Sequence, residues 1–143
     1  MQNTYSFQTT VKWNEGLTGT ISAPQLSPFI VATPPEFKNG VPNTWSPEHL
    51  FVASVNICLM TTFIAVAANS KLDVTRYLSD AVGVIEKIDG KFMFSRIELK
   101  PTIHIKFEKD FERAERILKK AENLCLVSNS IKSGLILTPK IIT

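Results

Sequence analysis

The sequence predicts an α+β fold, in which an antiparallel sheet is combined with a long buried central helix and a second helix. Three observations support this prediction: a charge-free apolar segment at Leu50–Ala68, a long alternating segment after Asp89-Gly90, and an amphipathic segment at Phe111–Cys125. The expected order of elements is β-β-β-α-β-β-α-β, with the strands mainly in hairpins. A chain of 143 residues has the size of one ordinary domain, so we expect residues 1–143 to form a single domain.

The N-terminal part of the chain is expected to form three short strands. Apolar and polar residues alternate from Tyr5 to Trp13, which is the period of a strand. Asn14-Glu15-Gly16 is a turn signal, after which Leu17–Ala23 can return as the hairpin partner. Ser27–Thr33 is the third strand candidate. Residues 24–47 hold six of the eight prolines, which predicts an irregular segment leading into the central helix.

The central helix has a clear start. Ser46 is a good N-cap, and Pro47 suits the first helical position, where its missing N–H costs nothing. Charges stop after Glu48 and do not return until Lys71. A helix that is apolar nearly all round is buried on nearly all sides. One small sheet cannot cover it, so we predict a homodimer in which a second copy of the chain buries the rest.

The second half of the chain predicts a long hairpin. After the helix ends at Asn69-Ser70-Lys71, Leu72–Leu78 is expected to connect it to a strand at Asp80–Ile88. Asp89-Gly90 favours a type I′ turn into a second arm, Lys91–Phe107. That arm alternates apolar and polar residues and is therefore expected to be half-buried.

A second helix and a last strand complete the predicted fold. Asp110 can cap a helix over Phe111–Cys125, whose apolar stripe places Cys125 on the inward face near the C-terminal end. Leu135–Ile142 is predicted to be the last strand, with Pro139 at an edge or a bulge.

Charge and composition exclude several functions. The net charge is +3, and the sixteen Lys and Arg residues are scattered, so a nucleic-acid partner is not expected. Met1–Thr10 has no apolar core typical of a secretory signal. Polar residues interrupt Leu50–Ala68, so we do not expect a membrane span. The predicted location is the reducing cytoplasm, where a static structural disulfide is not expected.

The two cysteines, Cys58 and Cys125, allow two interpretations. Both lie on inward faces of predicted helices, where free cysteine commonly serves as a small buried hydrophobe. Alternatively they form a thiol pair, in which one thiolate attacks an electrophile and the other resolves the product as a disulfide. Their spacing matches no zinc motif and no CxxC motif.

Two further residues, Glu48 and His49, are candidates for the same chemistry. Glu48 in the first helical turn complements the helix dipole, and it could also hold a cation or polarise a thiol. Ten residues of helix rise about 15 Å, so Glu48 is not expected to touch Cys58 of its own helix. His49 beside Glu48 is a general-base candidate. His104 lies on the polar face of a strand and is expected to be solvated.

Two stretches of the chain resemble motifs of one protein family. Pro47–Cys58, with the sequence PEHLFVASVNIC, resembles the P-E-x-L-x-x-A-x-x-x-C helix of the OsmC/Ohr family, the osmotically inducible and organic-hydroperoxide-resistance proteins. Cys125–Ser130, with the sequence CLVSNS, resembles that family's second-cysteine motif, C-P-x-S-N-A. The order of elements and the interval between the cysteines are also similar to those of the family.

The resemblance implies an intertwined OsmC-like homodimer with active sites at the subunit interface. It implies that Cys58 is the peroxidatic thiolate, which reduces an organic or fatty-acid hydroperoxide and becomes a sulfenic acid. Cys125 then resolves it as a disulfide, and a dithiol or lipoyl-type reductant resets the pair without a bound cofactor or metal. The resemblance assigns Glu48 the role of pairing with an arginine from the N-terminal region.

This sequence departs from the family pattern at two positions. Its first arginine is Arg76, so only Lys12 and Lys38 offer a long cationic side chain before the central helix, and a lysine lacks the planar fork that pairs with a carboxylate. Leu126 also stands where the family has proline. The missing arginine motivates an alternative, an OsmC-like dimer that binds a small apolar ligand without peroxidase turnover. A third interpretation is thiol-based acyl or redox chemistry on another substrate.

Overall fold

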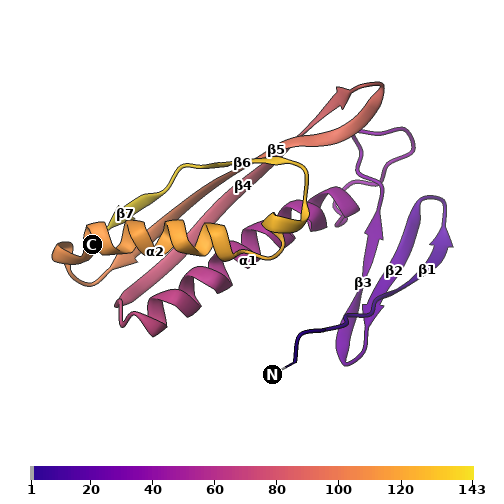
Figure 1. Cartoon of the computed structure of the whole chain (residues 1–143). Coiled ribbons are helices and arrows are strands. Elements are labelled where there is room, and N and C mark those ends of the chain that lie inside the picture. The colour runs from indigo at the N-terminus through magenta and orange to yellow at the C-terminus, as the bar shows by residue number, and fades with distance from the viewer. Residues whose placement is uncertain (1) are drawn as a thin grey trace. The chain divides into compact units, whose positions relative to one another are not determined.

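The computed structural model describes residues 2–143 (Figure 1). The chain divides into two compact units, one ending at Leu50 and the other running from Phe51 to Thr143. Each unit is described by itself below. The helix α1 begins in the first unit and continues into the second.

The first unit contains a three-stranded antiparallel sheet in the order β1-β2-β3. The strands are β1 (Thr10–Glu15), β2 (Thr18–Ala23) and β3 (Leu26–Ala32). Gly16 adopts a φ of +52° in the β1–β2 turn, a conformation that favours glycine. The three predicted strands are thus confirmed. The first one starts only at Thr10, however, because residues before it have no pairing partner on β2.

The segment between β3 and α1 is irregular, as its prolines predict. The Ala32 N–H donates to the Trp45 carbonyl at 2.9 Å, which anchors the end of the segment beside β3. Gly40 is packed so closely on the Pro34 carbonyl that a Cβ there would overlap it. Position 40 therefore needs glycine because there is no space for a side chain, and not because of its φ angle.

Helix α1 spans Pro47–Asn69, and both of its predicted ends are confirmed. The Ser46 Oγ accepts a hydrogen bond from the His49 N–H at 3.1 Å, which is N-cap geometry. At the other end, Lys71 has a φ of 55°. The Leu72 N–H donates to Ala67 and the Lys71 N–H donates to Ala68. This pair of bonds is a Schellman motif, in which a left-handed residue satisfies the last carbonyls of the helix.

The second unit is built on the long antiparallel hairpin of β4 (Val74–Ile88) and β5 (Lys91–Ile105). Asp89 and Gly90 have φ values of 49° and 81°, the signs that a type I′ turn requires. The predicted turn is confirmed. The prediction that Leu72–Leu78 only connects was wrong, because β4 starts at Val74 and pairs with β5 back to Ile105.

The sheet of the second unit is mixed rather than purely antiparallel. β6 (Gly134–Leu137) and β7 (Lys140–Ile142) both pair with β5 in parallel. Helix α2 (Phe111–Leu124) carries the chain back along the sheet between β5 and β6, and such a crossover produces a parallel pair. The single strand predicted over residues 135–142 is interrupted at Thr138 and Pro139, where proline has no N–H to donate.

Two short 3₁₀ segments flank α2, namely η1 (Glu108–Asp110) and η2 (Ser128–Ser130). The prediction that Asp110 caps α2 was wrong in its detail, because its side chain makes no capping hydrogen bond. Its carboxylate instead lies 3.4 Å from the Arg113 guanidinium. Cys125 comes directly after the last helical residue, in an extended conformation.

The core of the second unit lies between the sheet and the two helices, which pack on the same side of it (Figure 1). The core residues are Val55, Leu59, Phe63, Val66 and Ala67 of α1, Leu72, Ile97, Leu99, Ile103 and Ile105 around the sheet, and Ala114, Ile117, Leu118 and Ala121 of α2. The predicted α+β fold class with two helices is confirmed.

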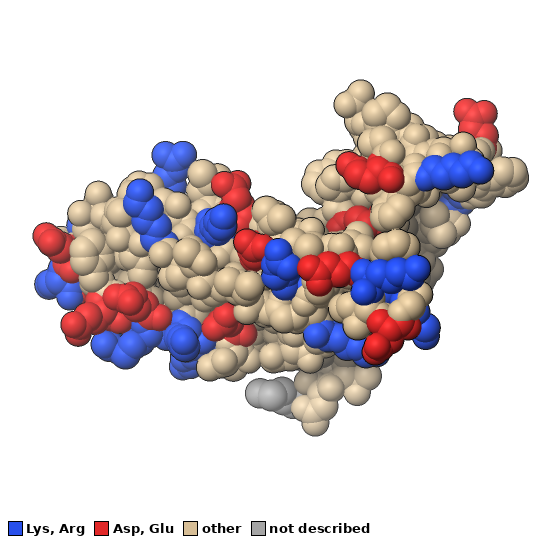
Figure 2. All heavy atoms as spheres, turned by 90° about the horizontal axis from the view of Figure 1, so that it is seen from above, with Lys and Arg blue, Asp and Glu red and all other residues tan. Residues whose placement is uncertain are grey.

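Helix α1 is buried on one side only within a single chain. Ile57, Met60 and Ile64 on its other side are 56%, 37% and 41% exposed. By length and composition α1 would also suit a membrane span, but five of its residues belong to the core. Charged residues of both signs are interspersed on the face of the molecule drawn in Figure 2.

Candidate thiol site

The structure brings the two cysteines together. Cys58 lies in the middle of α1 and is partly exposed, whereas Cys125 follows α2 and is 0% exposed. Both are free thiols, and the thiol of Cys125 is hydrogen-bonded to the sulfur of Cys58. The sequence predicted that both cysteines lie on inward faces of helices, and the structure adds that their thiols are neighbours.

The pKa of Cys58 is below the ordinary value of a thiol. Burial is the largest single influence and acts in the opposite direction, because it disfavours the charged thiolate. Several hydrogen bonds together outweigh it. The donors are the Cys125 thiol, the backbone N–H groups of Val127 and Leu126, and the Thr62 hydroxyl, whose Oγ1 is 3.9 Å from the Cys58 Sγ. All of these donors are uncharged.

The pKa of Cys125 is raised. Burial is again the largest influence, and the neighbouring Cys58 sulfur adds to it by hydrogen bonding and by charge repulsion. The Ser128 hydroxyl, 3.1 Å from the Cys125 Sγ, and the Ser128 N–H act in the opposite direction. The two thiols are therefore chemically different, with Cys58 the one that ionises first.

A tight turn after α2 positions the donors around both sulfurs. The Asn129 N–H donates to the Cys125 carbonyl at 3.0 Å, and the Ser130 N–H donates to the Val127 carbonyl at 3.0 Å. The N–H groups of Val127 and Leu126 help to lower the pKa of Cys58, and the N–H of Ser128 acts in the same direction on Cys125. The motif CLVSNS thus contributes through both its side chains and its backbone.

A buried polar cluster lies beneath α1 and was not predicted from the sequence. The Asn56 Nδ2 donates to the Ser79 carbonyl at 3.0 Å, while the Asn56 Oδ1, the Tyr77 hydroxyl and the Ser79 Oγ are buried without a hydrogen-bond partner among the described residues. The pKa of Tyr77 is raised to about 12, mainly by burial, with a smaller contribution from charge on Cys125. The signal available in the sequence was that Tyr77 and Ser79 share one face of β4.

The other candidates do not join the thiol pair within one chain. Glu48 is in the first turn of a continuous α1, so about 15 Å of helix rise separates it from Cys58. Its Oε1 is buried, and within residues 2–143 it has no hydrogen-bond partner. His49 contacts the Ser46 Oγ through Nδ1 at 2.7 Å and therefore supports the helix start. His104 lies on β5, opposite Arg76 of β4.

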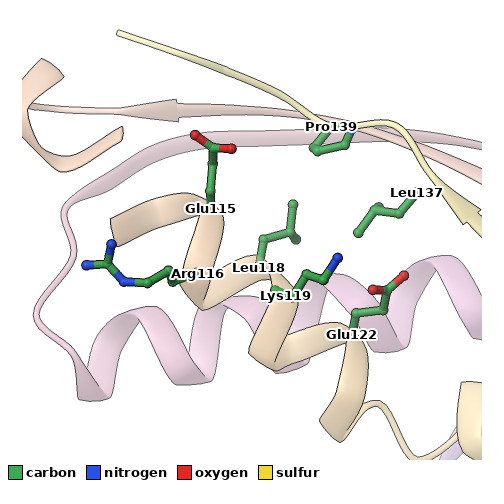
Figure 3. A pocket seen from close by; sticks show the side chains of 7 residues that line it. All are labelled: Glu115, Arg116, Leu118, Lys119, Glu122, Leu137 and Pro139. Atoms are coloured by element: carbon green, nitrogen blue, oxygen red, sulfur yellow. The ribbon is translucent and has the colours of Figure 1, made fainter. Parts of the chain in front are cut away.

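Two surface hollows lie outside this site. The larger, about 510 Å³, is lined by Glu115, Arg116, Leu118, Lys119, Glu122, Leu137 and Pro139. Figure 3 shows Leu118 of α2 facing Leu137 and Pro139, while Arg116 points away from them. The smaller, about 380 Å³, lies in the first unit beside Trp45 and His49. In the part of the chain that the structure describes, no group of three or more His, Cys, Asp or Glu side chains is arranged to hold a metal.

Comparison with known proteins gives a consistent result. The sequence profile of the family described as OsmC-like protein matches residues 40–140. The uncharacterized protein YmaD of Bacillus subtilis is 23% identical over 124 residues, which cover 85% of this chain and 81% of that protein.

Solved structures show the same fold. An OsmC-like protein of unknown function from Vibrio cholerae superposes with a TM-score of 0.88 at 20% identity, covering 95% of this chain and 99% of the other. An organic hydroperoxide resistance protein from Elizabethkingia anophelis, determined with thiocyanate bound, gives a TM-score of 0.78 at 22% identity, covering 100% and 99%. The profile match extends over most of the chain, from the segment before α1 to the start of β7. The chain therefore belongs to the OsmC family.

Proposed function

We propose that this protein is a cysteine-dependent peroxidase that reduces organic hydroperoxides, including those of fatty acids, in an antioxidant stress response. The observation that carries the proposal is the pair of free thiols, of which Cys58 has a lowered pKa and accepts a hydrogen bond from Cys125. A nucleophilic thiolate with a second thiol at hand is what two-step peroxide reduction needs.

The proposed reaction has three steps. The Cys58 thiolate attacks the terminal oxygen of the hydroperoxide, the O–O bond breaks, and the alkoxide leaves and takes up a proton to become the alcohol. Cys58 is then a sulfenic acid. The Cys125 sulfur attacks the Cys58 sulfur and displaces hydroxide, which takes the Cys125 proton and leaves as water. An external dithiol or lipoyl-type reductant restores both thiols by exchange, so the protein itself needs no cofactor.

The proposal includes a homodimer with the active sites at its interface. In a single chain, Val11 and Trp13 on β1 are 66% and 74% exposed, and the outer side of α1 carries three exposed apolar residues. Exposed apolar surface of this kind is a feature of interaction sites. In the dimer, Glu48 is proposed to organise a cation near Cys58, supplied by Lys12 or Lys38. We propose a soluble, cytoplasmic protein of a single domain.

The alternative function is that of an OsmC-like dimer which binds a small apolar ligand without turnover. One observation favours it: every donor that lowers the pKa of Cys58 is uncharged, and no arginine precedes α1. Without a cation beside the sulfur, the leaving alkoxide would lack electrostatic stabilisation.

Steady-state peroxide consumption separates the two functions. Cumene hydroperoxide or tert-butyl hydroperoxide is supplied with dithiothreitol or dihydrolipoamide, and the loss of peroxide is followed. We expect turnover that is abolished in Cys58→Ser. In Cys125→Ser, sulfenic acid formation should remain while disulfide formation is lost. Absence of turnover with either peroxide and either reductant would reject the peroxidase and leave the binding function.

A further inference from the structure

We propose that Asn56 is a positioning residue for the thiol pair. Its hydrogen bond to the Ser79 carbonyl fixes the rotation of α1 on the sheet, and thereby the direction in which Cys58 points. The inference rests on the proposed function, in which the Cys58 sulfur must meet Cys125. It gives a role to a buried amide that takes no direct part in the proposed reaction.

Burial alone gives α1 little preference for one rotation about its own axis. In an amphipathic helix, burial of the single apolar side sets the rotation. Helix α1 carries no charged residue between Leu50 and Ala68, and its outer side presents the apolar side chains of Ile57, Met60 and Ile64. A rotated α1 would therefore bury a similar apolar area. A directional contact is needed to select the observed orientation.

The Asn56 side chain provides such a contact. Its Nδ2 donates to the Ser79 carbonyl of β4 at 3.0 Å. The register partner of Ser79 on β5 is Pro101, which has no N–H to donate to this carbonyl. The hydroxyls of Ser54 and Thr61 on the same helix donate instead to carbonyls of α1 itself. The Asn56 bond therefore ties the helix to the sheet, whereas the other two bonds leave it free to rotate.

The burial of Asn56 supports this role. Its Oδ1 is buried and has no hydrogen-bond partner within residues 2–143, and such an atom lowers the stability of the folded state. In packed helices, a single buried asparagine fixes the register at a cost in stability. The same exchange explains an amide on a helix that is otherwise mostly apolar.

The rotation of α1 decides where Cys58 points. Cys58 follows Asn56 by two residues of one continuous helix, which corresponds to about 200° of rotation and about 3 Å along the axis. The two side chains leave the helix on different sides, and a rotation of the helix moves both. With Asn56 bound to β4, the Cys58 thiol neighbours that of Cys125. A rotation by one residue position, about 100°, would turn the Cys58 sulfur away from it.

The test measures how readily the two cysteines form a disulfide. The folded protein is equilibrated with glutathione and glutathione disulfide, so that each Cys58–Cys125 disulfide formed consumes one glutathione disulfide and releases two glutathione molecules. We expect Asn56→Leu, which keeps the size of the side chain and removes the donor, to lower the equilibrium constant about tenfold, or about 1.4 kcal/mol. Thr61→Val is the matched control and should leave it unchanged, because the hydroxyl that it removes binds α1 itself.

This equilibrium separates positioning from a merely structural role. A general loss of stability affects the reduced and the oxidised protein alike and does not move the constant. An unchanged constant in Asn56→Leu would overturn the proposal, and so would an equal fall in Thr61→Val. If Asn56→Leu does not fold, Asn56→Ala removes the same amide without adding apolar bulk, and the same fall is expected.

The readout needs no peroxide. If the protein does not turn over hydroperoxide but the constant falls in Asn56→Leu alone, the proposed function fails and the inference holds. If the protein turns over hydroperoxide and the constant is the same in both variants, the inference fails and the function holds.

Discussion

Helix α1 packs closely on β4 at Gly83, and this contact predicts how a larger residue there would change the stability of the protein. Gly83 faces α1, and a Cβ added there would lie 2.7 Å from the Phe94 Cε1 and 3.0 Å from its Cδ1, and closer still to the Val52 Cγ2. Carbon atoms pack best at about 3.5–4.0 Å. The Phe94 ring cannot easily move away, because it is stacked on Phe51 with a centroid distance of 4.7 Å.

We therefore expect Gly83→Ala to lower the free energy of unfolding by about 2 kcal/mol, within the usual range for overpacking. Urea unfolding followed by far-ultraviolet circular dichroism measures it. Gly134→Ala is the matched control, because a Cβ there meets only the Ser95 carbonyl oxygen at an ordinary 3.7 Å. Val52→Ala should remove part of the clash, so that the double variant loses less stability than the sum of the two single variants.

A Gly83→Ala variant that is no more destabilised than Gly134→Ala would show that α1 does not pack this closely on Gly83. Additive losses of stability in Val52→Ala and Gly83→Ala would show that the Val52 side chain is not part of the clash. A shifted α1 would matter for function, since Cys58 lies on the same helix as Val52.

Three further predictions concern single side chains. Ser46→Ala removes the N-cap of α1 and should lower the free energy of unfolding, measured in urea, by about 1 kcal/mol. A free energy that is unchanged within error would show that Ser46 does not stabilise the helix start. Ser128→Ala removes a donor to Cys125 and should raise the alkylation midpoint of Cys125, measured in a Cys58→Ser background; a lowered midpoint would argue against the bond. Tyr77 has a pKa raised from 10.0 to about 12, so its neutral form is favoured in the folded state and its stabilising contribution is lost as the pH rises from about 10 through 12. Tyr77→Phe should therefore lose less stability across that range than the unmodified protein. Identical pH profiles of unfolding free energy for the two proteins would contradict this prediction.

Features encoded by neighbouring residues could be predicted from the sequence. Ser46-Pro47 defines the start of α1, and Asp89-Gly90 defines the hairpin turn, because capping and type I′ turns depend on a few adjacent residues. The inward position of Cys125 followed from helical periodicity.

Features that depend on distant pairing could not be predicted. The parallel pairing of β6 and β7 with β5 is decided by the path of α2 across the sheet. The start of β4 at Val74 depends on a partner at Ile105, and nothing in the local pattern of Leu72–Leu78 indicates it.

In the candidate site, too, features carried by local motifs could be predicted and features that depend on the tertiary fold could not. The two cysteines and Glu48 were identifiable from the motifs. Two of the four donors that lower the pKa of Cys58, those of Val127 and Leu126, are backbone N–H groups. Every residue except proline carries such a group, so the sequence pattern does not single them out. Tyr77 became a neighbour of the site through the packing of β4 under α1.

The central claim is that Cys58 and Cys125 act as a redox pair within one chain. The most direct measurement treats the reduced protein with one equivalent of cumene hydroperoxide and analyses it by mass spectrometry without reduction. We expect a chain lighter by two hydrogen atoms, and a proteolytic digest in which the Cys58 and Cys125 peptides are linked. A Cys58 that carries only added oxygen while Cys125 stays a free thiol, or a disulfide that joins two chains, would contradict it.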